Sequence, residues 1–287
     1  GNKSMADQTI NVVDTTPPAL TGGSNGSSES TGIDPSLNGN YIAWRDGFAG
    51  VSATDNCGLA TMSYIEGDWG SSACGETITV TFIGTDECGL TSSQDQVFVI
   101  SDTTPPALAG GSDGSSECTG SDPSLNANYI AWRDNFGGVT SMDVSGTVFM
   151  SYSEGDWSST GCTDTIIVTF IATDECGLTS SQNQEFVISD TIAPILDFVP
   201  ADVTIECTSD TSSLVTGVAT GNDTCGDVVI TESDAEISTC GNTKIITRTW
   251  TATDECGNTS NADQVITVVD TTPPSITAPA TATVECT

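Results

Sequence analysis

One segment of this sequence appears four times, and this repetition limits the folds open to the chain more than any other feature. The segment begins with an Asp-Thr pair followed by prolines, at Asp14, Asp102, Asp190 and Asp270. Each interval is about 80 to 90 residues, which is too long for a solenoid repeat and typical of a small domain. The sequence therefore predicts a row of similar domains.

The two ends of the chain align with parts of a full repeat, so we expect the chain to be a window of a longer array. Residues 1–13 match the last strand of a repeat, and residues 270–287 match its first strands. The predicted complete repeats are 14–101, 102–189 and 190–269.

The charge of the chain excludes several kinds of partner. It carries 39 acidic and 5 basic residues, a formal net charge of −34, and no histidine. Such a surface repels phosphate backbones and anionic lipids, so we expect no nucleic acid partner. The same charge favours divalent cations.

Eleven cysteines recur at fixed places without the Cys-x-x-Cys spacing of zinc sites. This pattern favours disulfides over a metal cluster, and disulfides indicate an exported, extracellular protein. No apolar run reaches the roughly 20 residues of a membrane helix, so we expect no membrane insertion in this window.

Period-two alternation of apolar and polar residues predicts β-strands. Ile78, Val80 and Phe82 alternate with threonines, and Arg248 interrupts the same pattern in the third repeat, where we expect its stem to lie against Trp250 near a sheet edge. We also interpret YIAWRD (41–46 and 129–134) as a strand. About seven short strands per repeat predict an all-β fold of tandem immunoglobulin-like Greek-key β-sandwiches, arranged as an extended rod by stiff Pro-containing linkers.

The third repeat resembles a known family. Its segments VTIEC, NDTCG, CGNTKIITRTWTATDECGNTS and ITVVDTTPP resemble the four-cysteine form of the hyalin-repeat (HYR-like) domain. This family has an immunoglobulin-like fold and occurs in tandem in large adhesins of gliding and related bacteria. The resemblance implies adhesion, or a structural stalk, at a bacterial cell surface.

Each repeat has four cysteine positions. The first position holds Ser30, Cys118 and Cys207, the second Cys57, Ser145 and Cys225, the third Cys74, Cys162 and Cys240, and the fourth Cys88, Cys176 and Cys256. If the second and sixth strands run the same way, first pairs with fourth and second with third. This predicts the disulfides Cys57–Cys74, Cys118–Cys176, Cys207–Cys256 and Cys225–Cys240. Cys88, Cys162 and Cys286 are then unpaired or bonded outside the window. A wiring of first with second position is the alternative.

Aspartates at the repeat starts and in the TDECG turns make calcium the candidate cofactor, because calcium selects hard oxygen ligands. The candidate ligands are Asp14, Asp86, Glu87, Asp102, Asp174, Glu175, Asp190, Asp254, Glu255 and Asp270. The alternative is that the TDECG aspartate caps its own turn. Both interpretations stay open.

The sequence gives no catalytic site. Without histidine there is no Ser-His-Asp or Cys-His pair. Trp69 and Trp157 stand beside carboxylates in EGDW and are candidate glycan contacts, although core tryptophan is commoner in sandwiches. We expect a non-catalytic, extracellular array that acts as a stalk or adhesin segment, with neighbouring repeats or copies of itself as partners. A subunit of an assembled filament and a carbohydrate-binding module are the alternatives.

Overall fold

The structure is a computed structural model that describes residues 3–32, 34–72 and 74–284. The chain divides into two compact units. The first combines Gly1–Ser112, Arg133–Glu154 and Val168–Gln184, and the second combines Asp113–Trp132, Gly155–Ile167 and Glu185–Thr287. The repeat boundaries at 14–101, 102–189 and 190–269 stay a prediction. No helix within the described ranges is long and apolar enough to span a bilayer.

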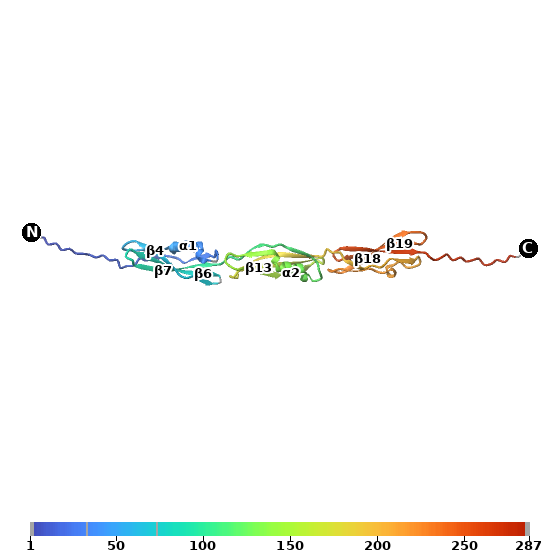
Figure 1. Ribbon diagram of the computed structural model, residues 1–287, viewed down its shortest axis with the longest axis horizontal. Helices are drawn as coiled ribbons and strands as arrows, with labels where there is room; N and C mark the ends of the chain where they lie inside the picture. The colour runs from blue at the N-terminus through green and yellow to red at the C-terminus, as the bar shows by residue number, and fades with distance from the viewer. Residues whose placement is uncertain (1–2, 33, 73, 285–287) are drawn as a thin grey trace. The chain divides into compact units, whose positions relative to one another are not determined.

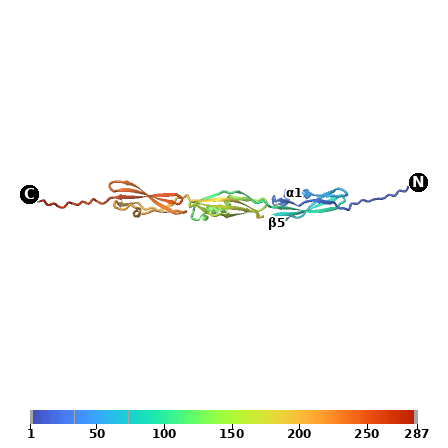
Figure 2. The same cartoon turned by 180° about the vertical axis from the view of Figure 1, so that it is seen from behind.

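Two sheets make up the start of the first unit. The larger follows the order β2 (Gly26–Glu29), β7 (Thr91–Ser101), β6 (Gly75–Asp86) and β4 (Ala60–Glu66), and β5 (Gly70–Ser72) also pairs with β6. β2 runs parallel to β7, while the other pairs are antiparallel. β1 (Ala19–Gly22) and β3 (Val51–Thr54) form a small antiparallel sheet. Figure 1 labels β4, β6 and β7, and Figure 2 shows β5 from behind.

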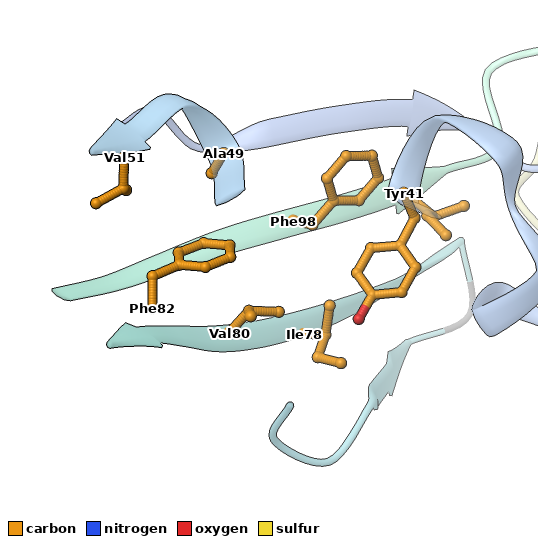
Figure 3. Packing of buried hydrophobic residues seen from close by; sticks show 8 residues of the cluster. Tyr41, Ala49, Val51, Ile78, Val80, Phe82 and Phe98 are labelled. Carbon is orange, nitrogen blue, oxygen red and sulfur yellow. The ribbon is translucent and has the colours of Figure 1, made fainter. Parts of the chain in front are cut away.

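The core of this part lies between the two sheets (Figure 3). Ile78, Val80 and Phe82 of β6 are buried, and the intervening threonines are not, as the alternation predicts. Val51 of the small sheet packs in the same cluster. Two sheets that enclose one apolar core form a β-sandwich, so the predicted all-β class is confirmed.

The strand predicted for YIAWRD is wrong, because these residues form α1 (Gly39–Asp46). Asn38 caps this helix, and its Oδ1 accepts hydrogen bonds from the backbone N–H of Asn40 (3.0 Å) and Tyr41 (3.2 Å). A 3-10 turn, η1 (Pro35–Leu37), precedes it, and a second, η2 (Phe48–Gly50), follows. The capping residue decides the local structure here, and the helix places Tyr41 in the core.

The middle of the chain repeats these pairings. In the first unit, β8 (Ala107–Gly110) pairs with β10 (Val139–Met142), and β11 (Phe149–Glu154) pairs with the second half of β13 (Thr163–Thr173). In the second unit, β9 (Gly114–Glu117) runs parallel to the end of β14 (Thr179–Ser189), and β12 (Ser158–Ser159) pairs with the start of β13. The helical segments are η3 (Pro123–Leu125), α2 (Ala127–Asp134) and η4 (Phe136–Gly138). The predicted strand 129–134 is therefore wrong for the same reason as in α1.

The last part of the second unit has a reduced helical segment. Its large sheet follows the order β16 (Val203–Glu206), β20 (Thr259–Val269), β19 (Lys244–Asp254) and β18 (Val228–Ser238). β15 (Ile195–Phe198) pairs with β17 (Thr220–Asn222), and α3 (Ser213–Thr216) precedes β17. Figure 1 labels β18 and β19 in this part of the chain.

Arg248 lies in the core of this last sandwich. Its side chain is 3 % exposed, and its guanidinium carbon lies 5.8 Å from the Trp250 ring centroid, so the predicted contact is confirmed. The expected edge position is wrong, because β19 lies between β18 and β20. The Arg248 Nε and Nη2 donate to Asp234 at 2.8 Å each, which balances the buried charge.

Candidate functional site

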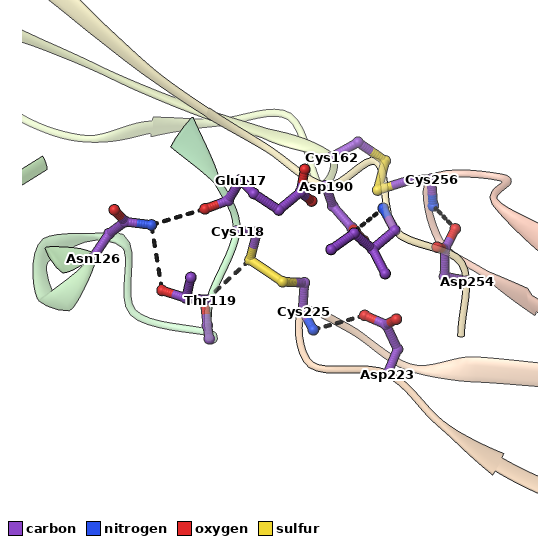
Figure 4. The surroundings of a disulfide bond; sticks show 12 residues. Glu117, Cys118, Thr119, Asn126, Cys162, Asp190, Asp223, Cys225, Asp254 and Cys256 are labelled. Atoms are coloured by element: carbon purple, nitrogen blue, oxygen red, sulfur yellow. Dashed lines mark hydrogen bonds between the residues drawn. A yellow bond between two sulfur atoms is a disulfide. The ribbon is translucent and has the colours of Figure 1, made fainter. Parts of the chain in front are cut away.

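Two disulfides lie in the second unit (Figure 4). Cys118 bonds Cys225 with a Cα–Cα distance of 6.1 Å, and Cys162 bonds Cys256 with 5.2 Å. The bonded residues are 107 and 94 positions apart in the sequence. The first bond joins a first cysteine position to a second, and the other joins a third to a fourth. Each bond thus connects successive predicted repeats.

The predicted pairs Cys118–Cys176, Cys207–Cys256 and Cys225–Cys240 are wrong, and so is the expectation that Cys162 is unpaired within the window. The error lies in strand direction. β16 runs parallel to β20 and β20 antiparallel to β19, so Cys207, which follows β16, lies near Lys244 at the start of β19. Cys256 follows the other end of β19, about 30 Å away at 3.3 Å per residue. A disulfide needs Cα atoms within about 7 Å.

The same register separates Cys57 from Cys74, so that predicted pair is wrong as well. Cys57 precedes Ala60, which pairs with Asp86 at the end of β6, whereas Cys74 precedes β6 at its start. Cys57, Cys88 and Cys240 are exposed and form no disulfide among the residues described. Cys286 lies outside the described residues.

The aspartates of the TDECG turns cap those turns. Asp86 Oδ1 accepts hydrogen bonds from the backbone N–H of Cys88 and Leu90, both at 2.9 Å, and Asp174 makes the equivalent bonds to Cys176 and Leu178. This is the capping interpretation. The second oxygen, Oδ2, of both Asp86 and Asp174 is buried and has no hydrogen-bond partner among the residues that the structure describes. A cation would satisfy that oxygen, so capping does not remove the metal hypothesis.

Three pairs of predicted ligands come together. Asp14 with Asp86, Asp102 with Asp174, and Asp190 with Asp254 each lie in a cluster whose ligand atoms are within 4.8 Å of one another. Each of these clusters also includes a cysteine sulfur, and Asp14 and Asp190 each belong to a second group, with Asp55 and Cys57 or with Asp223 and Cys225. Asp223, which the sequence-based ligand set missed, stands two residues before its cysteine position, as Asp55 does.

The remaining predicted ligands stay outside these clusters. Glu87, Glu175 and Glu255 are exposed. Asp270 is exposed as well, and its Oδ1 accepts a hydrogen bond from the Thr272 backbone N–H at 3.1 Å.

Burial, together with neighbouring negative charge, raises the pKa of two of these aspartates. Burial raises the pKa of Asp102, and the charges of Asp143 and Asp174 raise it further. Burial likewise raises the pKa of Asp190, with Asp223 and Asp254 contributing. A bound cation would relieve this repulsion, so the carboxylates fit calcium in charge and in hardness.

The fit is not equal at all three clusters. Burial acts to raise the pKa of Asp254, but hydrogen bonds from Asn258 and the backbone lower it overall. The Asn258 Nδ2 donates to Asp254 Oδ2 at 2.9 Å, so this oxygen is already satisfied. Leu90 and Leu178, which occupy the position of Asn258, have no such donor. The clusters of Asp14 and Asp102 therefore fit a cation better than that of Asp190.

The Asp102 cluster borders a small cavity that also contains cysteine side chains. The cavity has a volume of about 40 Å³, and its lining includes Ser30, Cys74, Asp102, Ser145, Asp174 and Cys176. Burial raises the pKa of the Cys176 thiol to about 12, and a side-chain hydrogen bond with Cys74 contributes. Two sulfur-bearing side chains thus lie together in the first unit.

A glutamate holds three of the four Asp-Thr linkers, a contact that was not predicted from the sequence. The Glu117 carboxylate accepts hydrogen bonds from the Thr191 N–H (2.8 Å) and hydroxyl (2.7 Å). Glu29 and Glu206 bind Thr103 and Thr271 in the same way. The recurrence of glutamate directly before the first cysteine position was the signal that could have revealed it.

Trp69 and Glu66 belong to one packed group. Glu66 Oε1 accepts hydrogen bonds from the Tyr41 hydroxyl (2.7 Å) and Arg45 Nη1 (2.8 Å). Trp69 is half-buried, and its ring packs edge-on against Tyr41 with centroids 4.9 Å apart. Trp157 packs on Tyr129 in the same manner. This geometry matches the core interpretation of both tryptophans, and a glycan contact stays a prediction.

Comparisons with known proteins give the following results. No protein-family model matches the chain, and no curated protein matches it. Among solved structures, three EC repeats of mouse cadherin-23 match 88% of this chain and 99% of that chain, with 10% identity and a TM-score of 0.28. Protocadherin gamma B2 EC1–5 matches 90% of this chain and 61% of that chain, with 12% identity and a TM-score of 0.30. For Drosophila N-cadherin EC1–4, the match spans 67% of this chain and only 58% of that chain, with 12% identity and a TM-score of 0.23. These TM-scores are too low to transfer a function from the cadherins to this chain.

Proposed function

We propose that this chain is a non-catalytic, load-bearing part of an extracellular repeat array, a stalk or adhesin segment of HYR-like type at a bacterial cell surface. The observation that carries the proposal is the pair of disulfides that join cysteines 107 and 94 residues apart. A bond over such a distance shields a long stretch of chain from extension. Extracellular export supplies the oxidising conditions that these bonds need.

The chemistry of the described residues supports a mechanical role. The sequence has no histidine. Glu66, the carboxylate at the end of β4 next to the EGDW turn, binds Tyr41 and Arg45. Similar domains in a row provide length and spacing, which fits presentation of an adhesive element beyond the chain.

Single-molecule stretching tests the proposal. When the chain is pulled from both ends, the Cys118–Cys225 bond withholds 107 residues, or about 350 to 390 Å at 3.3 to 3.6 Å per residue. A reductant should therefore increase the fully extended length by at least that amount. The same length in oxidised and reduced chains would overturn a load-bearing role for the bonds.

Calcium binding is part of this proposal, with Asp102 and Asp174 as the residues that would hold the ion. Bound calcium would neutralise the crowded carboxylates and stiffen the linker that begins at Asp102. Calorimetric titration with calcium should give heat that Asp174→Asn reduces, because it disables the Asp102 cluster, while Glu175→Gln, at an exposed neighbour, keeps all of it. Absence of heat in the unmodified chain, together with a melting temperature that a chelator leaves unchanged, would exclude the ion.

The cysteine pattern favours a filament subunit as the second candidate function. Cys57 and Cys88 occupy second and fourth positions, and Cys207 and Cys240 occupy first and third positions; none of them forms a disulfide in the described structure. These are the complementary halves of the two observed bond types. Under oxidising conditions, a filament subunit gives a ladder of covalent oligomers on a non-reducing gel, whereas a stalk segment stays monomeric. Surface glycans remain a third prediction, which binding to a glycan array and its loss in Trp69→Ala would test.

A further inference from the structure

Cys74 and Cys176 of the first unit lie against each other in the 40 Å³ cavity. The Cys74 side chain is close enough to Cys176 to help raise the pKa of its thiol. The Cys74 Sγ also lies 3.9 Å from the carbonyl oxygen of Glu175, the residue next to Cys176. Two cysteine side chains in direct contact are in the position that disulfide formation requires.

The backbone around this pair matches that of a bonded pair. Cys74 occupies the third position and Cys176 the fourth, as Cys162 and Cys256 do. The Asp102 N–H donates to the Cys74 carbonyl at 3.2 Å, and the Asp190 N–H donates to the Cys162 carbonyl at 3.1 Å.

The fourth-position residues are held alike too. The N–H groups of Cys176 and Cys256 each donate to an aspartate Oδ1, of Asp174 and Asp254, at 2.8 Å. Both backbones of the Cys74–Cys176 pair are thus fixed as they are in the Cys162–Cys256 bond.

Two serines provide an independent observation. Ser30 occupies a first position and Ser145 a second, the positions that Cys118 and Cys225 occupy in the other observed bond. Ser30 and Ser145 line the same cavity as Cys74 and Cys176. Both partners of one bond are therefore serine, so neither repeat keeps a thiol whose partner is missing. The single cysteine absent from each of the first two repeats is explained by pairing between successive repeats.

We propose that Cys74 and Cys176 form a disulfide, which gives the first unit one cross-link of the same type as Cys162–Cys256 in the second unit. One thiolate attacks a low-molecular-weight disulfide such as oxidised glutathione and displaces one thiol. The other thiolate attacks the mixed disulfide and displaces the second thiol. The two cysteines lose two protons and two electrons, and the oxidant is reduced to two thiols.

Peptide mapping tests this directly on the whole chain. Protein equilibrated with oxidised glutathione is denatured without reductant, treated with N-ethylmaleimide and digested with pepsin at acidic pH, where disulfides do not exchange. Mass spectrometry should find a peptide that links Cys74 to Cys176, with no maleimide on either residue. Maleimide on both, in a sample where the Cys162–Cys256 peptide is linked, would overturn the proposal.

Matched variants separate this bond from non-specific oxidation. In Cys74→Ser, the Cys176 peptide should be linked to no other peptide and should carry either maleimide or glutathione, whereas Cys57→Ser, a change at an exposed cysteine, should keep the Cys74–Cys176 link. Ser30→Cys combined with Ser145→Cys should create a second linked peptide beside the first. A Cys176 peptide linked to another cysteine peptide of the chain in Cys74→Ser would assign it another partner and refute the pairing. Such a result leaves the proposed function intact, because that depends on the two bonds of the second unit.

Discussion

Equivalent strand positions in two sandwiches hold an apolar residue in one and a charged residue in the other. In β6 of the first unit it holds Val80, fully buried, opposite Glu66 of β4. In β19 of the second unit it holds Arg248, 2 % exposed, opposite Asp234 of β18. Each acid binds an arginine, but the arginine of Glu66 comes from helix α1 (Arg45).

The difference teaches that an ion pair can be kept while the element that supplies its cation changes. Where α1 brings Tyr41 and Arg45 over the sheet, the strand position can be valine. Where α3 is only four residues long, the strand supplies the arginine itself, and Arg248 also donates to the Thr216 hydroxyl and the Thr211 carbonyl. The sheet is constant, and the layer above it varies.

The largest expected change in stability comes from removal of the buried aromatic ring that α1 supplies. Tyr41→Ala removes a buried ring that packs against Trp69 and Phe98, and should lower the free energy of unfolding by about 3 to 5 kcal/mol. Denaturant titration of the oxidised chain measures it. Leu37→Ala, at an exposed site next to α1, is the control and should change stability little. A loss below about 1 kcal/mol for Tyr41→Ala would contradict the role of α1 as a core element.

The next largest change in stability is expected when the Arg248–Asp234 ion pair is broken. Asp234→Asn removes the close counter-charge of the buried Arg248 and leaves only Glu232, at 3.8 Å, so it should cost about 3 kcal/mol. Glu66→Gln, at the matching position, should cost about 1 kcal/mol or less, because Arg45 is 21 % exposed and keeps Asp46. Equal losses in the two variants would refute the distinction between a buried and a half-exposed pair.

Replacement of both members of the ion pair tests whether an unpaired buried charge causes the loss of stability. Arg248→Met with Asp234→Leu replaces the pair by apolar side chains, and should recover most of the stability lost in Asp234→Asn. A double variant less stable than Asp234→Asn would mean that the bonds to Thr211 and Thr216 dominate.

A smaller effect comes from one hydroxyl. Tyr41→Phe keeps the ring and removes the hydrogen bond to Glu66, which should cost about 1 kcal/mol. The matched change Tyr129→Phe in α2 tests whether the second helix acts alike. Stabilisation by Tyr41→Phe would show that the hydroxyl does not contribute.

The smallest expected effect is on how the free energy of unfolding depends on pH. The hydrogen bond from Arg45 lowers the pKa of Glu66 from 4.5, and that from Arg248 lowers the pKa of Asp234 from 3.8. A folded-state pKa below the unfolded value adds stability above the unfolded pKa, and this is lost as pH falls through the folded pKa. The free energy of unfolding should therefore decrease as the pH falls from 5 to about 2. Each of the variants Glu66→Gln and Asp234→Asn should make this decrease less steep. A steeper decline in either variant would reverse the sign.

Much of the fold could be predicted from the sequence because strand alternation is local. Ile78, Val80 and Phe82 are buried as their spacing indicates. Helix α1 was missed because one capping residue, Asn38, outweighs the strand-like composition after it. Arg248 and Trp250 lie two residues apart on one strand, so their contact could be predicted from the sequence. Its partner Asp234 lies on the neighbouring strand and depends on register.

The disulfides could not be predicted from spacing alone. Their pairing depends on the parallel run of β16 beside β20, a relation between residues about 60 positions apart that no local pattern encodes. The aspartate clusters were partly predictable, since Asp102 and Asp174 come from recurring motifs. Asn258 stands where the other two turns have leucine. Its hydrogen bond to Asp254 depends on a three-dimensional contact that the sequence does not show.

The two cystines also overlap in chain order, since Cys162 lies inside the loop closed by Cys118 and Cys225, and Cys256 lies beyond it. A protease that cuts any one peptide bond between Cys118 and Cys256 cannot release a fragment, because a covalent route remains around every such cut. Secreted enzymes in the surroundings of a cell could nick this segment once and still leave it whole.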